Sequence, residues 1–149
     1  MKQSIAAVVI SLCLAILPFE AMAYNGEIVK FKMHDSQIYP GTVRNISVYV
    51  PKEYDGKTPA CLWVSMSGGS FMLDTLDKLI ADGEIPVIIG VFVSPGQIRD
   101  AEGNVVRYNR SNELDRMDGR YAEFLETEVL PEVCKRKTTD GRAIKISER

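Results

Sequence analysis

Ala60–Val64 (Ala-Cys-Leu-Trp-Val) and Pro86–Val93 (Pro-Val-Ile-Ile-Gly-Val-Phe-Val) are the two stretches that decide the fold of this 149-residue chain. Both are apolar without alternation, which is typical of parallel strands that are covered on both faces. Between them Leu73, Leu76 and Ile80 recur at helical spacing. The order of strand, helix and strand predicts a right-handed βαβ unit.

Two strands are expected before this unit. Glu27–Met33 alternates between apolar and polar residues, which is the period of a half-buried strand. Tyr39–Thr42 forms a turn, and Val43–Val50 alternates in the same way until Pro51, which cannot donate to a ladder. The fold class is therefore α/β, with an antiparallel pair of edge strands in front of the parallel unit.

The second half of the chain is less apolar. Ser94–Asn112 is rich in polar and turn residues and predicts a long loop, and long loops at strand ends often carry function. Gly119–Val133 predicts an amphipathic helix that Pro131 kinks in its last turn or ends. After Cys134 the few apolar residues are not expected to complete a core, so this sheet should remain incomplete.

The first 23 residues have the pattern of a signal peptide. Lys2 gives the positive start, Ile5–Leu17 the apolar run, and Ala21–Ala23 a small-x-small cleavage site before Tyr24. An apolar run of 13 residues is too short to be a membrane anchor. We expect export to a periplasmic or extracellular location, with residues 24–149 forming the mature domain.

Charge and cysteine content exclude several classes of partner. The net charge is −2 and no basic cluster is present, which argues against nucleic acid. No second apolar run approaches membrane-spanning length. Cys61 and Cys134 could form a disulfide in an oxidising compartment, or Cys61 could be a small core residue and Cys134 an unrelated thiol. Neither lies in a ligand pattern and the chain has one histidine, so we expect no metal and no cofactor.

The order and spacing of several motifs resemble one family. The matching stretches are Tyr39–Arg44, Val48–Pro51 with Tyr54-Asp55, Pro59–Val64, Pro86–Val93 with Pro95-Gly96, Asn109–Ser111 with Glu113 and Asp115, Arg120–Leu125 and Leu130–Val133. In this order they resemble the esterase family of the α/β-hydrolase superfamily, which includes enterochelin-esterase-like and feruloyl-esterase-like proteins. The resemblance covers residues 38–146.

This resemblance implies a serine carboxylic-ester hydrolase acting on small-molecule or glycan-linked esters. In the family the next element would be a strand and a Gly-x-Ser-x-Gly nucleophile elbow, followed by the acid and the histidine of the triad. The 149 residues contain no Gly-x-Ser-x-Gly. The chain is therefore expected to be the first part of an α/β-hydrolase domain, truncated before the nucleophile elbow and inactive alone.

The turn after the first parallel strand is the first candidate site. The resemblance places the backbone amides of Ser67, Gly68 and Gly69 in the oxyanion hole, which stabilises the tetrahedral intermediate of acyl transfer. The alternative is a flexible strand-to-helix turn. Ser67 is not expected to be a nucleophile, because residue 65 is not glycine and His34 comes before it in the chain.

The loop after the second parallel strand is the other candidate site. Arg110, Glu113 and Asp115 match an Arg-Ser and acidic cluster that lies on the substrate side in the family. A buried Arg–carboxylate pair could hold this loop over the pocket. The alternative is a solvated charged loop with carboxylates that cap helices.

A second functional class stays open. The chain could be a non-catalytic exported binding or interaction module that keeps half of a hydrolase fold. Such a module would have to cover its open sheet edge, and self-association through that edge is the expected partner contact.

Overall fold

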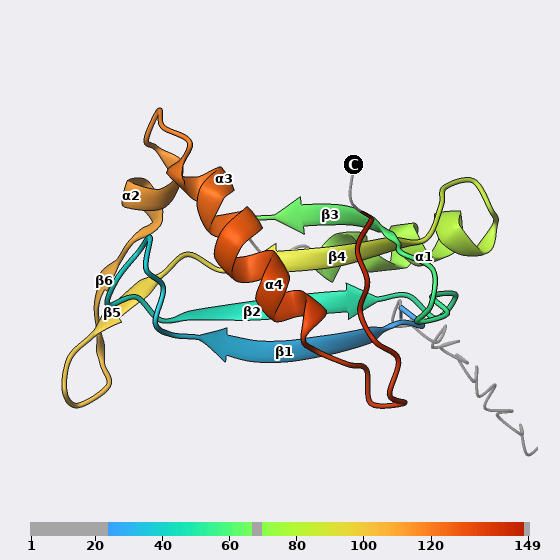
Figure 1. Cartoon of the computed structure of the whole chain (residues 1–149), viewed down its shortest axis with the longest axis horizontal. Coiled ribbons are helices and arrows are strands. Elements are labelled where there is room, and N and C mark those ends of the chain that lie inside the picture. Colours follow the sequence, from blue (N-terminus) through green and yellow to red (C-terminus); the bar gives the residue numbers. More distant parts are fainter. Residues whose placement is uncertain (1–23, 67–69, 148–149) are drawn as a thin grey trace, which may run out of the picture.

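The protein is an α/β domain with one main sheet between two helical layers (Figure 1). A computed structural model describes residues 24–66 and 70–147. Its elements are, in chain order, β1 (Glu27–Met33), β2 (Arg44–Val50), β3 (Cys61–Ser65), the 3₁₀ turn η1 (Ser70–Met72), α1 (Leu73–Ala81), β4 (Ile88–Val93), β5 (Gln97–Arg99), β6 (Val105–Tyr108), α2 (Arg110–Leu114), α3 (Arg120–Phe124), the π-helical segment η2 (Leu125–Val129) and α4 (Leu130–Cys134).

The main sheet has the strand order β1-β2-β4-β3. β1 pairs with β2 and β2 pairs with β4 in antiparallel register, whereas β3 and β4 are parallel, with Leu62 opposite Ile89. An antiparallel pair followed by a parallel βαβ unit is the arrangement that the sequence predicts. The turn at Tyr39–Thr42 is also confirmed, since the Thr42 amide donates to the Tyr39 carbonyl at 3.3 Å.

Each face of the sheet is covered by its own helix. The helix α3–η2–α4 crosses one face, and α1 lies behind the other (Figure 1). The larger core is on the first side, where Ile46, Val48 and Val91 meet Phe124. The smaller core joins Tyr49, Leu73 and Phe92 on the α1 side. β2 is therefore covered on both faces, which a simple alternation of apolar and polar residues does not predict.

The long helix is continuous through its proline, which corrects the expectation that Pro131 could end it. α3, η2 and α4 follow one another without a break from Arg120 to Cys134, and η2 is a π-helical turn. A proline clashes with the carbonyl four residues earlier and lacks an N–H donor. The wider π turn directly before Pro131 removes the need for that bond, so the helix goes on to bury Val133.

The polar segment after β4 is more ordered than a loop. Its residues form the hairpin β5–β6 and the short helix α2. The hairpin turn is closed by Asp100, whose carboxylate accepts the Asn104 amide at 2.7 Å, and by Gly103 at φ 88°. The sequence predicted a loop here because turn-forming residues are frequent. The two strands have three and four residues, which is too short to show an alternation of apolar and polar side chains.

The segment after Cys134 returns to the sheet, which corrects the expectation that it adds nothing to a core. Ile144 is only 2% exposed and lies in the larger core. The Tyr54 hydroxyl donates to the Ala143 carbonyl at 3.0 Å and accepts the Lys145 amide at 2.8 Å. Ala60 and Ile146 form a parallel bridge beside β3. A few well-placed residues therefore cover one end of the sheet.

Replacing Ile144 by alanine tests the importance of this segment. Because the side chain is buried in the core, Ile144→Ala should lower the free energy of unfolding by about 2–4 kcal/mol. Denaturant unfolding followed by circular dichroism measures the change. Val106→Ala is the control, since Val106 is 61% exposed and should shift stability by less than about 0.5 kcal/mol. Equal small effects for both variants would show that the segment does not belong to the core.

Candidate functional site

Parallel strands β3 and β4 end at the same edge of the sheet, and both predicted sites follow these ends. The turn after β3 leads through Met66 to α1. Ser67, Gly68 and Gly69, the predicted oxyanion-hole residues, lie outside the described residues. Their role therefore stays a prediction, and the geometry of the site rests on the segment that follows β4.

Glu113 on α2 is the centre of a buried hydrogen-bond network. Its carboxylate accepts two parallel bonds from the Arg44 guanidinium, both at 3.0 Å. The Asn109 side-chain amide donates to the same carboxylate at 2.9 Å, and the Gly96 backbone amide donates at 3.2 Å. Glu113 is 3% exposed. Every lone pair of the carboxylate is thus used, as a charge out of water requires.

Arg44, the partner of Glu113, is held on its other sides as well. It is 2% exposed and begins β2. Its second terminal nitrogen donates to the Thr42 hydroxyl at 3.0 Å. The guanidinium carbon lies 4.3 Å from the centre of the Phe124 ring, a cation–π arrangement that suits the planar group. The network therefore joins β2, the turn before it, α2 and the long helix.

Gly96 is the point where the loop after β4 enters the network. A Cβ atom at this position would lie 2.6 Å from a Glu113 carboxylate oxygen and 2.9 Å from an Arg44 nitrogen. Only glycine lets the backbone approach a buried ion pair so closely. The Asn109 backbone N–H also donates to the Gly96 carbonyl at 2.8 Å. The loop that leaves β4 is consequently fixed at both backbone groups of one residue.

The structure separates the three residues predicted on the substrate side. Glu113 forms the buried pair, but its partner is Arg44 and not the neighbouring Arg110. Arg110 and Asp115 face each other at 3.8 Å with side chains 62% and 57% exposed. For these two the alternative of a solvated charged loop describes the geometry. A role for them in binding substrate remains a prediction.

Sequence reasoning missed Arg44 as a site residue, although one signal was present. Positions 44, 46, 48 and 50 share one face of β2, and the last three are Ile46, Val48 and Val50. A charged residue in phase with buried aliphatic residues must have a buried partner. The identity of that partner, 69 residues further on, is not visible in any local pattern.

The titratable groups around the network do not supply a base. Burial raises the pKa of Tyr121 to about 12, and burial with the nearby Glu113 charge also raises the pKa of Tyr39. Both phenols therefore stay protonated at neutral pH. His34 lies exposed directly after β1, as predicted, on a different strand from this network. The network can position a loop, whereas proton transfer near pH 7 needs other groups.

A wide groove lies along β3, away from the network. It has a volume of about 940 Å³ and is lined by Cys61 and Leu62 of β3, Glu126 of η2, Leu130, Pro131 and Cys134 of α4, and the segment Ile146-Ser147. None of the predicted site residues lines it. Within the described ranges, no group of three or more His, Cys, Asp or Glu could hold a metal ion.

Cys61 and Cys134 both lie at this groove as exposed, free thiols. Cys61 was expected either in a disulfide or in the core, and the structure shows neither. The reason is that β3 lies at the edge of the sheet, with its first residue exposed and the next four partly exposed. The apolar run Ala60–Val64 predicts the strand correctly, but it does not show that one side lacks a neighbour.

Comparisons with known proteins give matches only among solved structures. No protein-family model and no curated protein sequence matches the chain. A mutant of the feruloyl esterase module from Clostridium thermocellum, complexed with sinapinate, is 21% identical with a TM-score of 0.48, covering 72% of this chain and 35% of that one. A structure named FAE is 20% identical with a TM-score of 0.49, covering 78% and 39%.

A ferulic acid esterase is 21% identical with a TM-score of 0.48, and the match covers 81% of this chain and 46% of that one. This chain therefore spans less than half the length of the three solved structures it is similar to. Among the residues that the structure describes, no helix is long and apolar enough to cross a membrane.

Neutralising Glu113 tests whether the buried pair organises the fold. Glu113→Gln keeps the shape but leaves the Arg44 charge buried without a counter-ion, so the free energy of unfolding should fall by about 3–5 kcal/mol. Denaturant unfolding measures this. Asp115→Asn is the matched control on the same loop, because its exposed pair should contribute less than about 1 kcal/mol. Similar losses of stability in the two variants would show that the Arg44–Glu113 pair does not organise the fold.

Proposed function

We propose that this chain is part of an exported carboxylic-ester hydrolase of the α/β-hydrolase type. The observation that supports the proposal most is the buried Arg44–Glu113 pair, because it fixes the loop that leaves the parallel strand β4. In α/β folds with parallel strands, substrates bind in the crevice beyond the carboxyl ends of those strands. A rigid loop at this edge is what a substrate wall requires.

In this proposal the chain supplies structure and the reaction needs further groups. Acyl transfer by a serine requires the nucleophile, a histidine base and an acid that orients it. The sequence has one histidine and no Gly-x-Ser-x-Gly turn. Ser67, Gly68 and Gly69 would contribute amides to the oxyanion hole, and Arg110 and Asp115 would line the substrate side.

The proposed enzyme reaches an extracytoplasmic location through its leader. Residues 1–23 would direct export and would be removed before Tyr24. The ester substrate would be a small molecule or a glycan-linked ester, a class that follows from the family resemblance.

A second candidate function is a non-catalytic binding module, which the open edge of β3 favours. Ala60 bonds to the Lys145 carbonyl and the Ser147 amide, which are on the side away from β4. Leu62 and Val64 follow at alternate positions, so their backbone groups point to that same side. Within residues 24–66 and 70–147 these groups of Leu62 and Val64 have no backbone partner, and such an edge beside an apolar groove favours pairing with another strand. Self-association through this edge is the partner contact of this candidate.

An ester-cleavage assay tests the first proposal. The purified chain should hydrolyse an aryl acetate no faster than buffer and should not react with a fluorophosphonate, since it lacks the activated serine. Turnover that a serine reagent abolishes would contradict the proposal that this chain lacks the catalytic serine. The nucleotide sequence downstream provides the positive test, because a Gly-x-Ser-x-Gly turn should be encoded within about 20 codons in the same or a shifted frame.

Sedimentation velocity separates the two candidates. A binding module that pairs through β3 should form a defined oligomer, and Cys61→Lys should convert it to monomer, because Cys61 is the exposed residue of β3 at the groove and an edge lysine blocks strand pairing. The control is Val106→Lys on β6, which lies outside the groove and should leave the oligomer unchanged. A monomer at all concentrations would contradict the self-association candidate.

A further inference from the structure

The start of the described chain is fastened to the α1 side of the sheet. The Asn25 backbone amide donates to the Asp77 carboxylate on α1. The Tyr24 ring meets the Tyr49 ring edge-on, with ring centres 5.9 Å apart. Gly26 lies so close to the Tyr49 ring that a Cβ atom there would overlap it. These contacts hold three consecutive residues before β1 begins.

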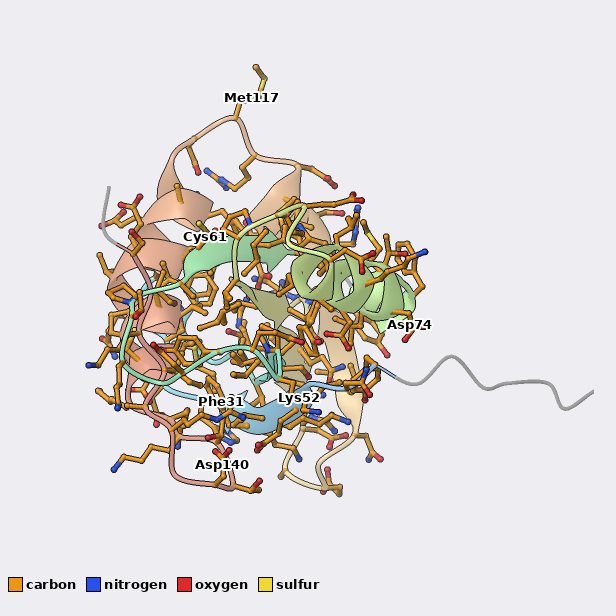
Figure 2. All side chains as sticks on the ribbon, turned by 90° about the vertical axis from the view of Figure 1, so that its right-hand side faces the viewer. Phe31, Lys52, Cys61, Asp74, Met117 and Asp140 are labelled. Atoms are coloured by element: carbon orange, nitrogen blue, oxygen red, sulfur yellow. The ribbon has the colours of Figure 1, made fainter. Side chains whose placement is uncertain are left out.

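The same place holds acidic oxygens that lack partners. Asp77 is 7% exposed, and its second carboxylate oxygen has no hydrogen-bond partner among the described residues. Asp74, which Figure 2 labels on α1, lies one turn earlier. One oxygen of this partly exposed residue is buried and also has no hydrogen-bond partner in the described ranges. The buried Tyr49 hydroxyl is likewise without a partner in the described ranges. Burying a carboxylate without compensating donors is costly, so this cluster calls for a cationic donor.

The expected cleavage site places such a donor beside the cluster. Removal of residues 1–23 leaves Tyr24 as the first residue, and its nitrogen becomes an ammonium group with three N–H donors. Bond lengths keep this nitrogen within about 4 Å of the Asn25 nitrogen, which already donates to Asp77. We propose that the α-ammonium group created by leader cleavage binds the buried Asp77 carboxylate and its partly exposed neighbour Asp74 on α1.

This site depends on processing for a simple chemical reason. Before cleavage the Tyr24 nitrogen is a neutral amide with a single N–H. After cleavage it carries a positive charge and three N–H donors beside the Asp77 carboxylate, which the neighbouring Asn25 amide already contacts. The processed chain therefore gains an ion pair that the precursor cannot form. The gain fastens the start of β1 to α1 and stabilises the folded state only once the leader is gone.

The experiment starts from the full chain, expressed in a bacterium that exports it. The inference rests on the proposed export, so the mass of the purified product is measured first and should correspond to a start at Tyr24. The α-amine is then acetylated at about pH 6.5 in guanidinium chloride, where the ion pair is absent and the α-amine reacts ahead of the lysines because its pKa is lower, and the protein is refolded. Acetylation removes the charge and leaves the side chains unchanged.

Thermal unfolding of the free and acetylated forms is compared in the parent protein and in Asp77→Asn. Acetylation should lower the melting temperature of the parent by roughly 4–8 °C, and by less than half as much in Asp77→Asn. The matched control is Asp82→Asn, an exposed position at the end of α1, which should keep the full acetylation effect. The same cycle is also run with Asp74→Asn, so that one variant remains if the other does not fold.

The outcomes separate this inference from its premise. A product that starts elsewhere than at Tyr24 overturns both the proposed cleavage and the ammonium site. A start at Tyr24 with the same acetylation effect in the parent and in the Asp77→Asn and Asp74→Asn proteins, or with no effect in any of them, overturns the site alone. A large effect in the parent that either aspartate substitution abolishes is the result that the structure predicts.

Discussion

The buried ion pair between Arg44 and Glu113 is the constraint on which the rest of the site depends. Taking both charges out of water costs several kcal/mol, so the pair requires the hydrogen bonds around it, and within the pair only the Arg44 Nε has no partner among the described residues. That requirement explains why Gly96 has no side chain and why Asn109 points inward. The Phe124 ring of the long helix lies beside the guanidinium, with its centre 4.3 Å from the Arg44 Cζ. One pair thus sets the position of four segments that are far apart in the chain.

The sequence predicted the strands well where one signal dominated. β1 has the bounds that its alternation indicates, and the parallel pairing of β3 with β4 follows from two unalternated apolar runs. The sequence did not predict which charged residues are buried, because exposed Arg110 and buried Glu113 stand in the same polar segment. The distinction arises from Arg44, which is remote in sequence and near in space. Periodicity describes a single element, whereas the pairing of charges depends on tertiary structure.

The two faces of the sheet hold different segments of the chain. The α3–η2–α4 face contains the ion-pair network and the larger core, and it fixes the loop at the carboxyl end of β4. The α1 face receives the first residues of the described chain through Asp77. The exposed loop between α2 and α3 carries Met117 away from the protein (Figure 2).

Hydrogen exchange at the Gly96 amide measures the central claim most directly. This N–H donates to the buried Glu113 carboxylate although it lies in a loop between strands. If the ion pair fixes the loop, the Gly96 amide should exchange only through global unfolding, as slowly as the amides at the centre of β2. Exchange as fast as that of the exposed Met117 amide would show that the loop opens independently, and the account of the site would be wrong.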